Sequence, residues 1–321
     1  MTWWFVGVAL AAVLVLACLS PLETARWWPK RGRARTRDAV AGGDPDHCPP
    51  GLPERYLAYL SGVGDIDPEA DPHEDEQWIL AEIAREFPQV KVLAGVHPYA
   101  VDSRALQNKT TGGSWEAASH LGEGPRTVIR DLLLQARNVG QALWAADPRY
   151  GPTYYADLGR QVWDELTDHG YVRGCRVPVT FLGYSGGAQM GLGASWFLTL
   201  FHVPCTVIAL VGVYSDDRGF AHVEHFWDVR GSKDLLRRIG PLMCPGRWPI
   251  NVWSTIHTAR RAGRVSFVNV GPVAHDGDDG YFDADASLPD GRSHAEATRD
   301  AIVTALREAQ DLPGGSGAPE L

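Results

Sequence analysis

The chain has 321 residues, of which about 45% are hydrophobic and 21% charged, and its formal net charge is −9. These values are ordinary for a globular protein and exclude a largely disordered chain, a collagen or a long coiled coil. The negative charge also argues against broad nucleic-acid binding.

The five cysteines stand at positions 18, 48, 175, 205 and 244. They are odd in number and form no close pairs, so they fit neither a disulfide framework nor a zinc site. Cys175 and Cys205 lie beside expected strands. We therefore interpret these two residues as buried free thiols.

The N-terminus is apolar and carries no charged side chain. Residues 3–22 contain no charged residue, and about 20 apolar residues suffice for a helix to cross a bilayer. Tryptophans flank this stretch, and six basic residues follow it between positions 26 and 37 with no acid among them. We expect a transmembrane anchor over residues 1–25, followed by a basic collar and linker over residues 26–54.

Two other interpretations of this N-terminus stay open, a processed signal peptide and a soluble hydrophobic tail. A cleaved signal peptide normally carries basic residues before its apolar run, and here no basic side chain precedes it. With an uncleaved anchor, the positive-inside rule predicts a single-pass protein of the cell membrane whose body lies in the cytoplasm.

Between residues 55 and 311, apolar runs alternate with amphipathic segments, which predicts an α/β domain with helices on both faces of a parallel sheet. Runs rich in Val, Leu and Ile predict strands at residues 55–60, 90–94, 177–182, 206–213, 223–229 and 264–270. Helices are predicted from residue 71 onward, at 126–144, at 155–169, at 186–200 and after a capping box formed by Ser293 and Glu296.

Three connecting segments of this domain are also informative. Residues 97–153 are too long for a simple connection, and we expect them to form a cap over the carboxyl edge of the sheet. Residues 214–222 are too short for a full crossover helix, so either that helix is missing or the expected strand limits are wrong. The tail at 312–321 is rich in Gly and Pro, and we expect it to be disordered.

The segment Gly183-Tyr184-Ser185-Gly186-Gly187 has the form Gly-x-Ser-x-Gly. An apolar run precedes it and a helical run follows, so the serine would lie on a strained turn between a strand and a helix. The flanking glycines remove side chains that would collide in such a turn. The N–H of Gly186 is then placed to stabilise a developing oxyanion.

A nucleophilic serine needs a base, and the base needs an acid that orients it. His275 follows the last expected strand, where a loop can return it to the serine. Asp234 follows the strand before it and is the favoured acid. Asp216 and Asp217, which follow the strand before that, are the alternatives, and Asp228 lies inside a strand and is less suitable.

These segments resemble those of the α/β-hydrolase superfamily. The resemblance covers roughly residues 55–311 and rests on residues 183–187, 231–234 and 271–275. It implies that Ser185 is the nucleophile, Asp234 the acid and His275 the base.

The resemblance has further implications for the fold and for the oxyanion hole. Val63 would be the second backbone contributor to that hole, beside Gly186, although Ser61 stands where the usual loop has a histidine. The two earliest strands of the usual fold are absent, which predicts a reduced sheet of about six mostly parallel strands.

Two more segments, residues 147–152 and 245–249, resemble those of bacterial membrane-linked hydrolase-like proteins, a likeness that implies no substrate. Their arginines, Arg149 and Arg247, and Tyr184 are the candidate substrate-binding residues. The two arginines suit a carboxylate or a phosphate, or equally a role in packing and salt bridges.

Together these features predict a membrane-anchored serine hydrolase that cleaves an ester or thioester, as a lipase, esterase or thioesterase does. No cofactor or metal is expected, because the acidic run at 276–279 lacks the spacing of a calcium loop and no complete nucleotide-binding glycine motif is present. The expected partners are a small or lipid-like acyl substrate and the membrane. A non-catalytic scaffold or ligand-binding protein, and an acyltransferase, are the alternatives.

Overall fold

The computed structural model describes residues 15–16, 18–19, 48–64, 73–99, 125–147, 149–275 and 277–312. The expected basic collar, most of the expected anchor and nearly all of the expected tail lie outside these ranges. Within them, no helix combines the length and apolar character needed to cross a membrane.

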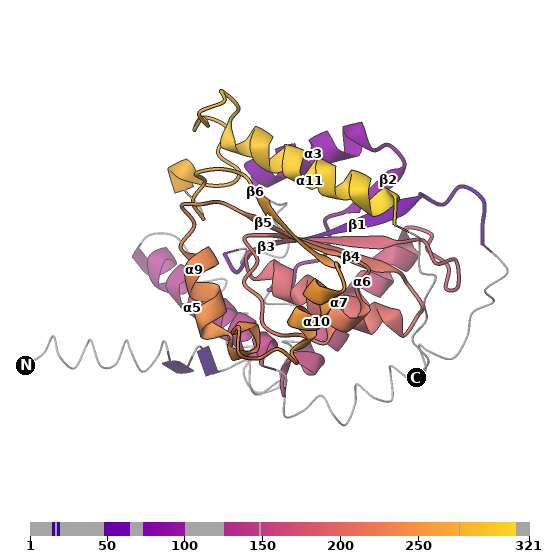
Figure 1. The fold of residues 1–321 in the computed structure, drawn as a ribbon, viewed down its shortest axis with the longest axis horizontal. Coiled ribbons are helices and arrows are strands. Elements are labelled where there is room, and N and C mark those ends of the chain that lie inside the picture. Colours follow the sequence, from indigo (N-terminus) through magenta and orange to yellow (C-terminus); the bar gives the residue numbers. More distant parts are fainter. Residues whose placement is uncertain are drawn as a thin grey trace, which may run out of the picture.

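Among the described residues, six strands form one parallel sheet in the order β2-β1-β3-β4-β5-β6 (Figure 1). Their bounds are Arg55–Leu60 for β1, Val90–Leu93 for β2, Val179–Tyr184 for β3, Cys205–Leu210 for β4, Phe226–Arg230 for β5 and Val265–Asn269 for β6. The expected number of strands and their parallel direction are thus confirmed. Because all strands run the same way, their carboxyl ends share one edge of the sheet.

Helices cover both faces of the sheet (Figure 1). One face carries α3 (Glu74–Glu86) and α11 (His294–Gln310). The other face carries α6 (Gly151–Asp168), α7 (Gly187–Thr199), α8 (Gly219–His222) and α10 (Thr255–Arg261). Helix α5 (Pro125–Ala146) packs against α6 and α7, and α9 (Leu236–Met243) follows β5.

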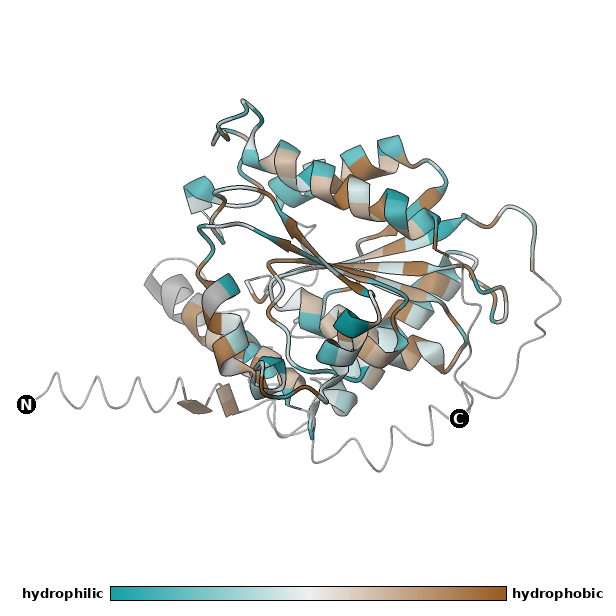
Figure 2. Ribbon diagram, in the orientation of Figure 1, coloured by the Kyte–Doolittle hydropathy of each residue, from teal (hydrophilic) through white to brown (hydrophobic). Residues whose placement is uncertain are grey.

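The four inner strands, β1, β3, β4 and β5, are buried on both faces, as their apolar sequences predict, whereas the edge strands β2 and β6 are partly exposed. In β1, Tyr56 and Ala58 pack in the core beneath α6 and α7, whereas Leu57 and Tyr59 pack in the core beneath α3 and α11. This alternation follows from the two-residue period of a strand. The brown strands at the centre of Figure 2 show the resulting apolar layer.

Several element limits differ by a few residues from the sequence-based expectation, and two of the differences are informative. The connection between β4 and β5 spans residues 211–225, because β4 ends at Leu210 and β5 begins at Phe226, and it holds only the single turn of α8. Of the two explanations offered, the second is confirmed: the expected strand limits were wrong, and the crossover helix is present as a single turn. Helix α3 begins at Glu74, later than predicted, and His73 at its N-cap makes no side-chain capping bond.

The interpretation of Cys175 as a free thiol is wrong. Cys48 and Cys175 form a disulfide with a Cα–Cα distance of 5.3 Å, which ties the end of the linker to the loop before β3. The sequence separation of 127 positions concealed this pair from a search for close spacings. Cys205, in contrast, is a buried free thiol, as expected.

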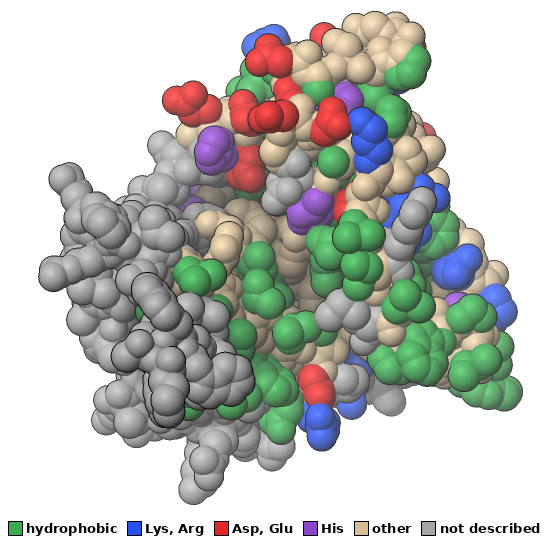
Figure 3. Space-filling view, turned by 90° about the vertical axis from the view of Figure 1, so that its left-hand side faces the viewer, with side chains coloured by type: hydrophobic (Ala, Val, Ile, Leu, Met, Phe, Trp, Pro, Cys, Tyr) green, Lys and Arg blue, Asp and Glu red, His purple; other side chains and the backbone are tan. Residues whose placement is uncertain are grey.

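Charged and apolar side chains are unevenly distributed over the surface. Figure 3 shows one face of the molecule, on which acidic side chains gather toward the top while hydrophobic side chains gather over the middle and lower parts. Large contiguous patches of exposed hydrophobic residues are uncommon on soluble proteins. The apolar part of this surface is therefore a candidate contact surface.

Candidate active site

The side chains of Ser185, His275 and Asp234 meet at the carboxyl edge of the sheet. Ser185 directly follows β3, and the other two lie on the loops after β6 and β5. Ser185 Oγ is 3.1 Å from His275 Nε2, and His275 Nδ1 is 3.3 Å from Asp234 Oδ2. A carboxylate only accepts hydrogen bonds, so Nδ1–H donates to Asp234. Nε2 is then left to accept from the Ser185 hydroxyl.

Ser185 has a φ of +51°, which a residue with a side chain rarely adopts. The turn is this tight because the strand and the helix approach each other closely at the two outer glycines. A Cβ on Gly183 would lie 2.5 Å from Ala188 N, and a Cβ on Gly187 would lie 2.2 Å from Leu60 O. Only glycine fits at these two positions, so the Gly-x-Ser-x-Gly pattern has a steric basis in this fold.

A third glycine lies where the loop that carries Asp234 meets the loop that carries His275. A Cβ on Gly231 would lie 2.1 Å from the carbonyl oxygen of Val273, so the two loops are in backbone contact there. Close by, Ser232 N donates to Gly271 O over 2.7 Å. Asp234 and His275 therefore meet because their backbones are bound to each other, not only through their side chains.

Asp234 is fully buried and well supplied with hydrogen-bond donors. Leu236 N donates to its Oδ1 over 2.8 Å, and the Tyr281 hydroxyl donates to its Oδ2 over 3.3 Å. The His275 side chain is 22% exposed, so small molecules can reach it, whereas the Asp234 side chain is fully buried. Such a buried carboxylate can hold an imidazole in one orientation.

The sequence left three alternative acids open, and each is engaged elsewhere. Asp217 accepts from Gln189 Nε2 and from Gly219 N, and Asp216 accepts from Ile256 N. Asp228 pairs with Arg230 and accepts from the Tyr214 hydroxyl. None of the three contacts His275 in the described structure.

Gly186 and Val63 lie together beside the serine, as the oxyanion expectation requires. A Cβ on Gly186 would lie 2.9 Å from Val63 Cγ1 and 2.5 Å from the hydroxyl oxygen of Tyr99. Tyr99 was not anticipated from the sequence. It is fully buried, and its hydroxyl has no hydrogen-bond partner among the residues that the structure describes.

Helix α5 holds the loops that carry Val63 and Tyr99. Asn138 Nδ2 donates to Val63 O over 3.0 Å, and Gln141 Nε2 donates to Pro98 O over 2.9 Å. Both amides are buried. Asn138 and Gln141 are three residues apart and so share one helix face, which is the only signal by which the sequence could have revealed them.

The candidate substrate-binding residues lie in different surroundings. The Tyr184 ring stacks on the His275 ring at 5.6 Å, and its hydroxyl donates to His275 O over 2.7 Å, so Tyr184 supports the base. The guanidinium of Arg149 is bound to both oxygens of Asp147 on the surface. The guanidinium of Arg247 lies 4.0 Å above the Tyr214 ring and donates to Tyr214 O. Both arginines thus have the salt-bridge or packing role that the sequence left open.

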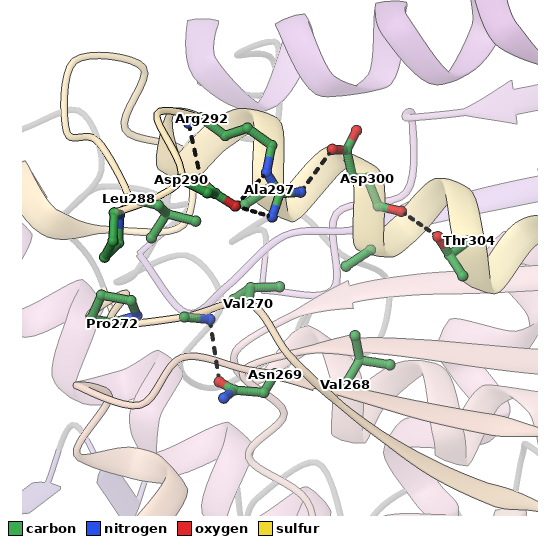
Figure 4. A pocket seen from close by; sticks show the side chains of 13 residues that line it. Val268, Asn269, Val270, Pro272, Leu288, Asp290, Arg292, Ala297, Asp300 and Thr304 are labelled. Atoms are coloured by element: carbon green, nitrogen blue, oxygen red, sulfur yellow. Dashed lines mark hydrogen bonds and ion pairs between the residues drawn. The ribbon is translucent and has the colours of Figure 1, made fainter.

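A groove lies away from Ser185, His275 and Asp234. This groove of about 490 Å³ runs between β6 and α11, and its charged residues Asp290, Arg292 and Asp300 bind one another (Figure 4). None of the three site residues lines it. In the described part of the chain, no group of three or more His, Cys, Asp or Glu side chains is placed to hold a metal ion.

Comparisons with known proteins add little to this geometry. No protein-family model matches the chain, and no curated protein sequence matches it. Among solved structures, the chain is similar to carboxyl esterase 2 from the mycorrhizal fungus Tuber melanosporum, with 13% identity and a TM-score of 0.43. The match covers 82% of this chain and 80% of the esterase. A likeness at this level supports no statement about activity.

Proposed function

We propose that the chain is a membrane-associated serine hydrolase with a reduced α/β-hydrolase fold, and that it cleaves an ester or thioester through an acyl-enzyme. One observation carries the proposal: Ser185 lies on a strained strand-to-helix turn, and its hydroxyl, His275 and Asp234 form a continuous hydrogen-bonded row. This is the arrangement that activates a serine hydroxyl.

In the first half of the reaction, Ser185 Oγ attacks the acyl carbon while His275 Nε2 takes the hydroxyl proton. The imidazolium that forms is stabilised by the Asp234 carboxylate. When the tetrahedral adduct collapses, the bond from carbon to the leaving oxygen or sulfur breaks, and His275 returns the proton to that atom. Water then attacks the acyl-enzyme by the same route, releasing the acid and restoring Ser185.

The negative charge on the carbonyl oxygen would be held by the backbone N–H groups of Gly186 and Val63 and by the hydroxyl of Tyr99. Burial raises the pKa of the Tyr99 hydroxyl, so it stays protonated and can donate. Within the described part of the chain this hydroxyl has no hydrogen-bond partner, which fits a donor that is used only when an oxyanion forms.

Tyr99→Phe is therefore expected to lower kcat by about tenfold to a hundredfold with little change in KM, since loss of one oxyanion donor acts on the transition state. Steady-state hydrolysis of a p-nitrophenyl ester measures both constants. Tyr171→Phe is the matched control, because its hydroxyl donates to Val177 O instead. An unchanged kcat in Tyr99→Phe would remove this residue from the oxyanion hole.

The proposed substrates are lipid-like acyl compounds, because the expected N-terminal anchor would hold the site beside a bilayer. Two features bear on the side of the membrane on which the body lies, and they point in opposite directions. The basic collar favours a cytoplasmic body, whereas disulfides persist mainly in oxidising compartments, and Cys48 is bonded to Cys175.

Peptide mapping without reduction is expected to recover Cys48 and Cys175 in one cross-linked peptide from the purified chain. Alkylation of thiols in intact cells before lysis then reports the compartment. Cysteines that are already bonded in the cell would place the body on an oxidising side, and cysteines that react would place it in the cytoplasm. Free alkylation of both in the purified, unreduced protein would contradict the bond itself.

A fluorophosphonate probe tests the proposed function directly. Its phosphorus is attacked by an activated serine and loses fluoride, so the purified full chain is expected to become labelled and Ser185→Ala is expected to remain unlabelled. Tryptic mapping should place the adduct on Ser185. Equal labelling of both proteins would overturn the nucleophile assignment and place the reactive group elsewhere, and labelling of neither would favour a non-catalytic ligand-binding role.

A further inference from the structure

The segment that joins the acid to the base differs in charge from the rest of the chain. Residues 235–275 contain no aspartate and no glutamate, although the whole chain carries a net charge of −9. The same residues contain six arginines, at positions 237, 238, 247, 260, 261 and 264. The segment is thus strongly basic in an otherwise acidic protein.

The same segment exposes large apolar side chains. Of the sixteen large hydrophobic residues that are exposed in the described structure, six lie between positions 235 and 253: Leu235, Leu242, Trp248, Ile250, Val252 and Trp253. Ile250 is 82% exposed and Trp253 is 88% exposed, so they project from the surface. We call these six residues, with Arg237, Arg260 and Arg261, the basic apolar face.

Hydrogen bonds hold this face in one arrangement. Trp248 Nε1 donates to Leu242 O over 3.2 Å, and Arg261 Nη1 donates to Val252 O over 2.7 Å. The second of these bonds places a guanidinium directly beside the loop that carries Trp253. Arg261 and the exposed residues Val252 and Trp253 are therefore neighbours in space.

An acidic residue that packs beneath this face, Asp216, already accepts hydrogen bonds from other residues of the protein. Asp216 contacts Gly246 and accepts hydrogen bonds from Ile256 N and from the Thr255 hydroxyl. Its charge is thereby partly compensated inside the protein. Arg237, Arg260 and Arg261, in contrast, are exposed.

We propose that the basic apolar face docks on the surface of a lipid bilayer that contains anionic headgroups. Exposed tryptophan and aliphatic side chains enter the region between headgroups and acyl chains, and arginines bind the phosphates. The face begins one residue after Asp234, so docking would turn the edge of the candidate active site toward the lipid.

The N-terminus supports a lipid surface over a protein partner as the occupant. Its residues 3–22 carry no charge, which is the composition of a segment that enters lipid. As proposed above, this segment would hold the body at a bilayer, where the arginines of the basic apolar face can meet anionic headgroups.

A depth measurement tests the docking. The full chain carrying Ile250→Cys is labelled with an environment-sensitive fluorophore and reconstituted into vesicles of phosphatidylcholine, with or without phosphatidylglycerol. Trp78→Cys on α3, which covers the opposite face of the sheet, is the matched control. The unsubstituted chain, labelled in parallel, accounts for the native free cysteines.

With phosphatidylglycerol present, the label at position 250 is expected to brighten and to be quenched by lipids with nitroxide in their acyl chains, while the label at position 78 is not. Replacing Arg260 and Arg261 by glutamine is expected to lower the docked-to-free ratio by about fivefold per arginine, the equivalent of about 1 kcal/mol each. If nitroxide lipids quench the label at position 250 in neither kind of vesicle, the proposal is overturned and a protein partner becomes the favoured occupant. Equal quenching in both vesicles would overturn the role of anionic lipid.

These measurements do not require turnover. They are made on chains that also carry Ser185→Ala, so the docking result stands or fails separately from the proposed hydrolysis.

Discussion

Asp234→Asn is expected to lower kcat for ester hydrolysis by about four orders of magnitude while leaving the fold intact. The amide has the same shape as the carboxylate, but its NH2 group can donate to His275 Nδ1. The proton of the neutral imidazole then lies on Nε2, which can no longer accept the proton of Ser185. Steady-state kinetics with a p-nitrophenyl ester give kcat, and circular dichroism verifies the fold.

Asp217→Asn is the matched control, since Asp217 is also a buried aspartate at the carboxyl edge of the sheet. Burial raises the pKa of Asp217, which means that its charge is disfavoured and that a neutral amide replaces it at little cost. We expect this variant to keep kcat within about tenfold of the parent. If the effects of the two substitutions were reversed, the acid would be Asp217 and the observed hydrogen-bonded row would not be the functional one.

Gly187→Ala is expected to destabilise the protein by about 3 kcal/mol or more and to abolish fluorophosphonate labelling of the remaining folded chain. The added Cβ would lie 2.2 Å from Leu60 O and 2.6 Å from Ser61 O. Both are backbone atoms of the β1 end, so no side-chain rotation relieves the collision. Either β1 or the turn at Ser185 must move. Urea unfolding followed by tryptophan fluorescence measures the loss.

Gly64→Ala provides the comparison for this substitution. Gly64 lies on the same loop after β1, but a Cβ there would meet no atom of the described residues within 4 Å. We expect its stability to change by less than about 1 kcal/mol, and its labelling to persist. Equal stability of the two variants would mean that β1 does not approach the serine turn as closely as the structure places it.

Much of the fold was readable from the sequence because most strands are rich in apolar residues and the inner strands are buried on both sides. Runs such as residues 55–60 and 265–269 consist mainly of apolar residues without helical period, and the structure has strands there with limits that differ by at most one residue. The α11 capping box at Ser293 and Glu296 is also present as predicted. These features depend on neighbours in sequence, which is why local pattern sufficed.

The exact limits of the β4–β5 region were not readable in the same way. Val211 and Val213 continue the apolar run of β4, yet Val211 has a φ of +53° and the strand ends at Leu210. The chain turns there because Val213 N donates to Ser185 O. A contact with the turn after β3 thus overrides the strand preference of the valines.

The sequence by itself determined the α/β class, the number and direction of the strands, and the turn on which Ser185 lies, since each follows from residues close together in the chain. Only the tertiary structure decided which aspartate meets His275, that Cys48 pairs with Cys175, and that Tyr99 lies beside Gly186. The physical reason is that each of these contacts joins segments about 40 to 130 residues apart. Such contacts depend on loops whose backbones touch, as Gly231 touches Val273. No pattern of neighbouring residues predicts which loops these are.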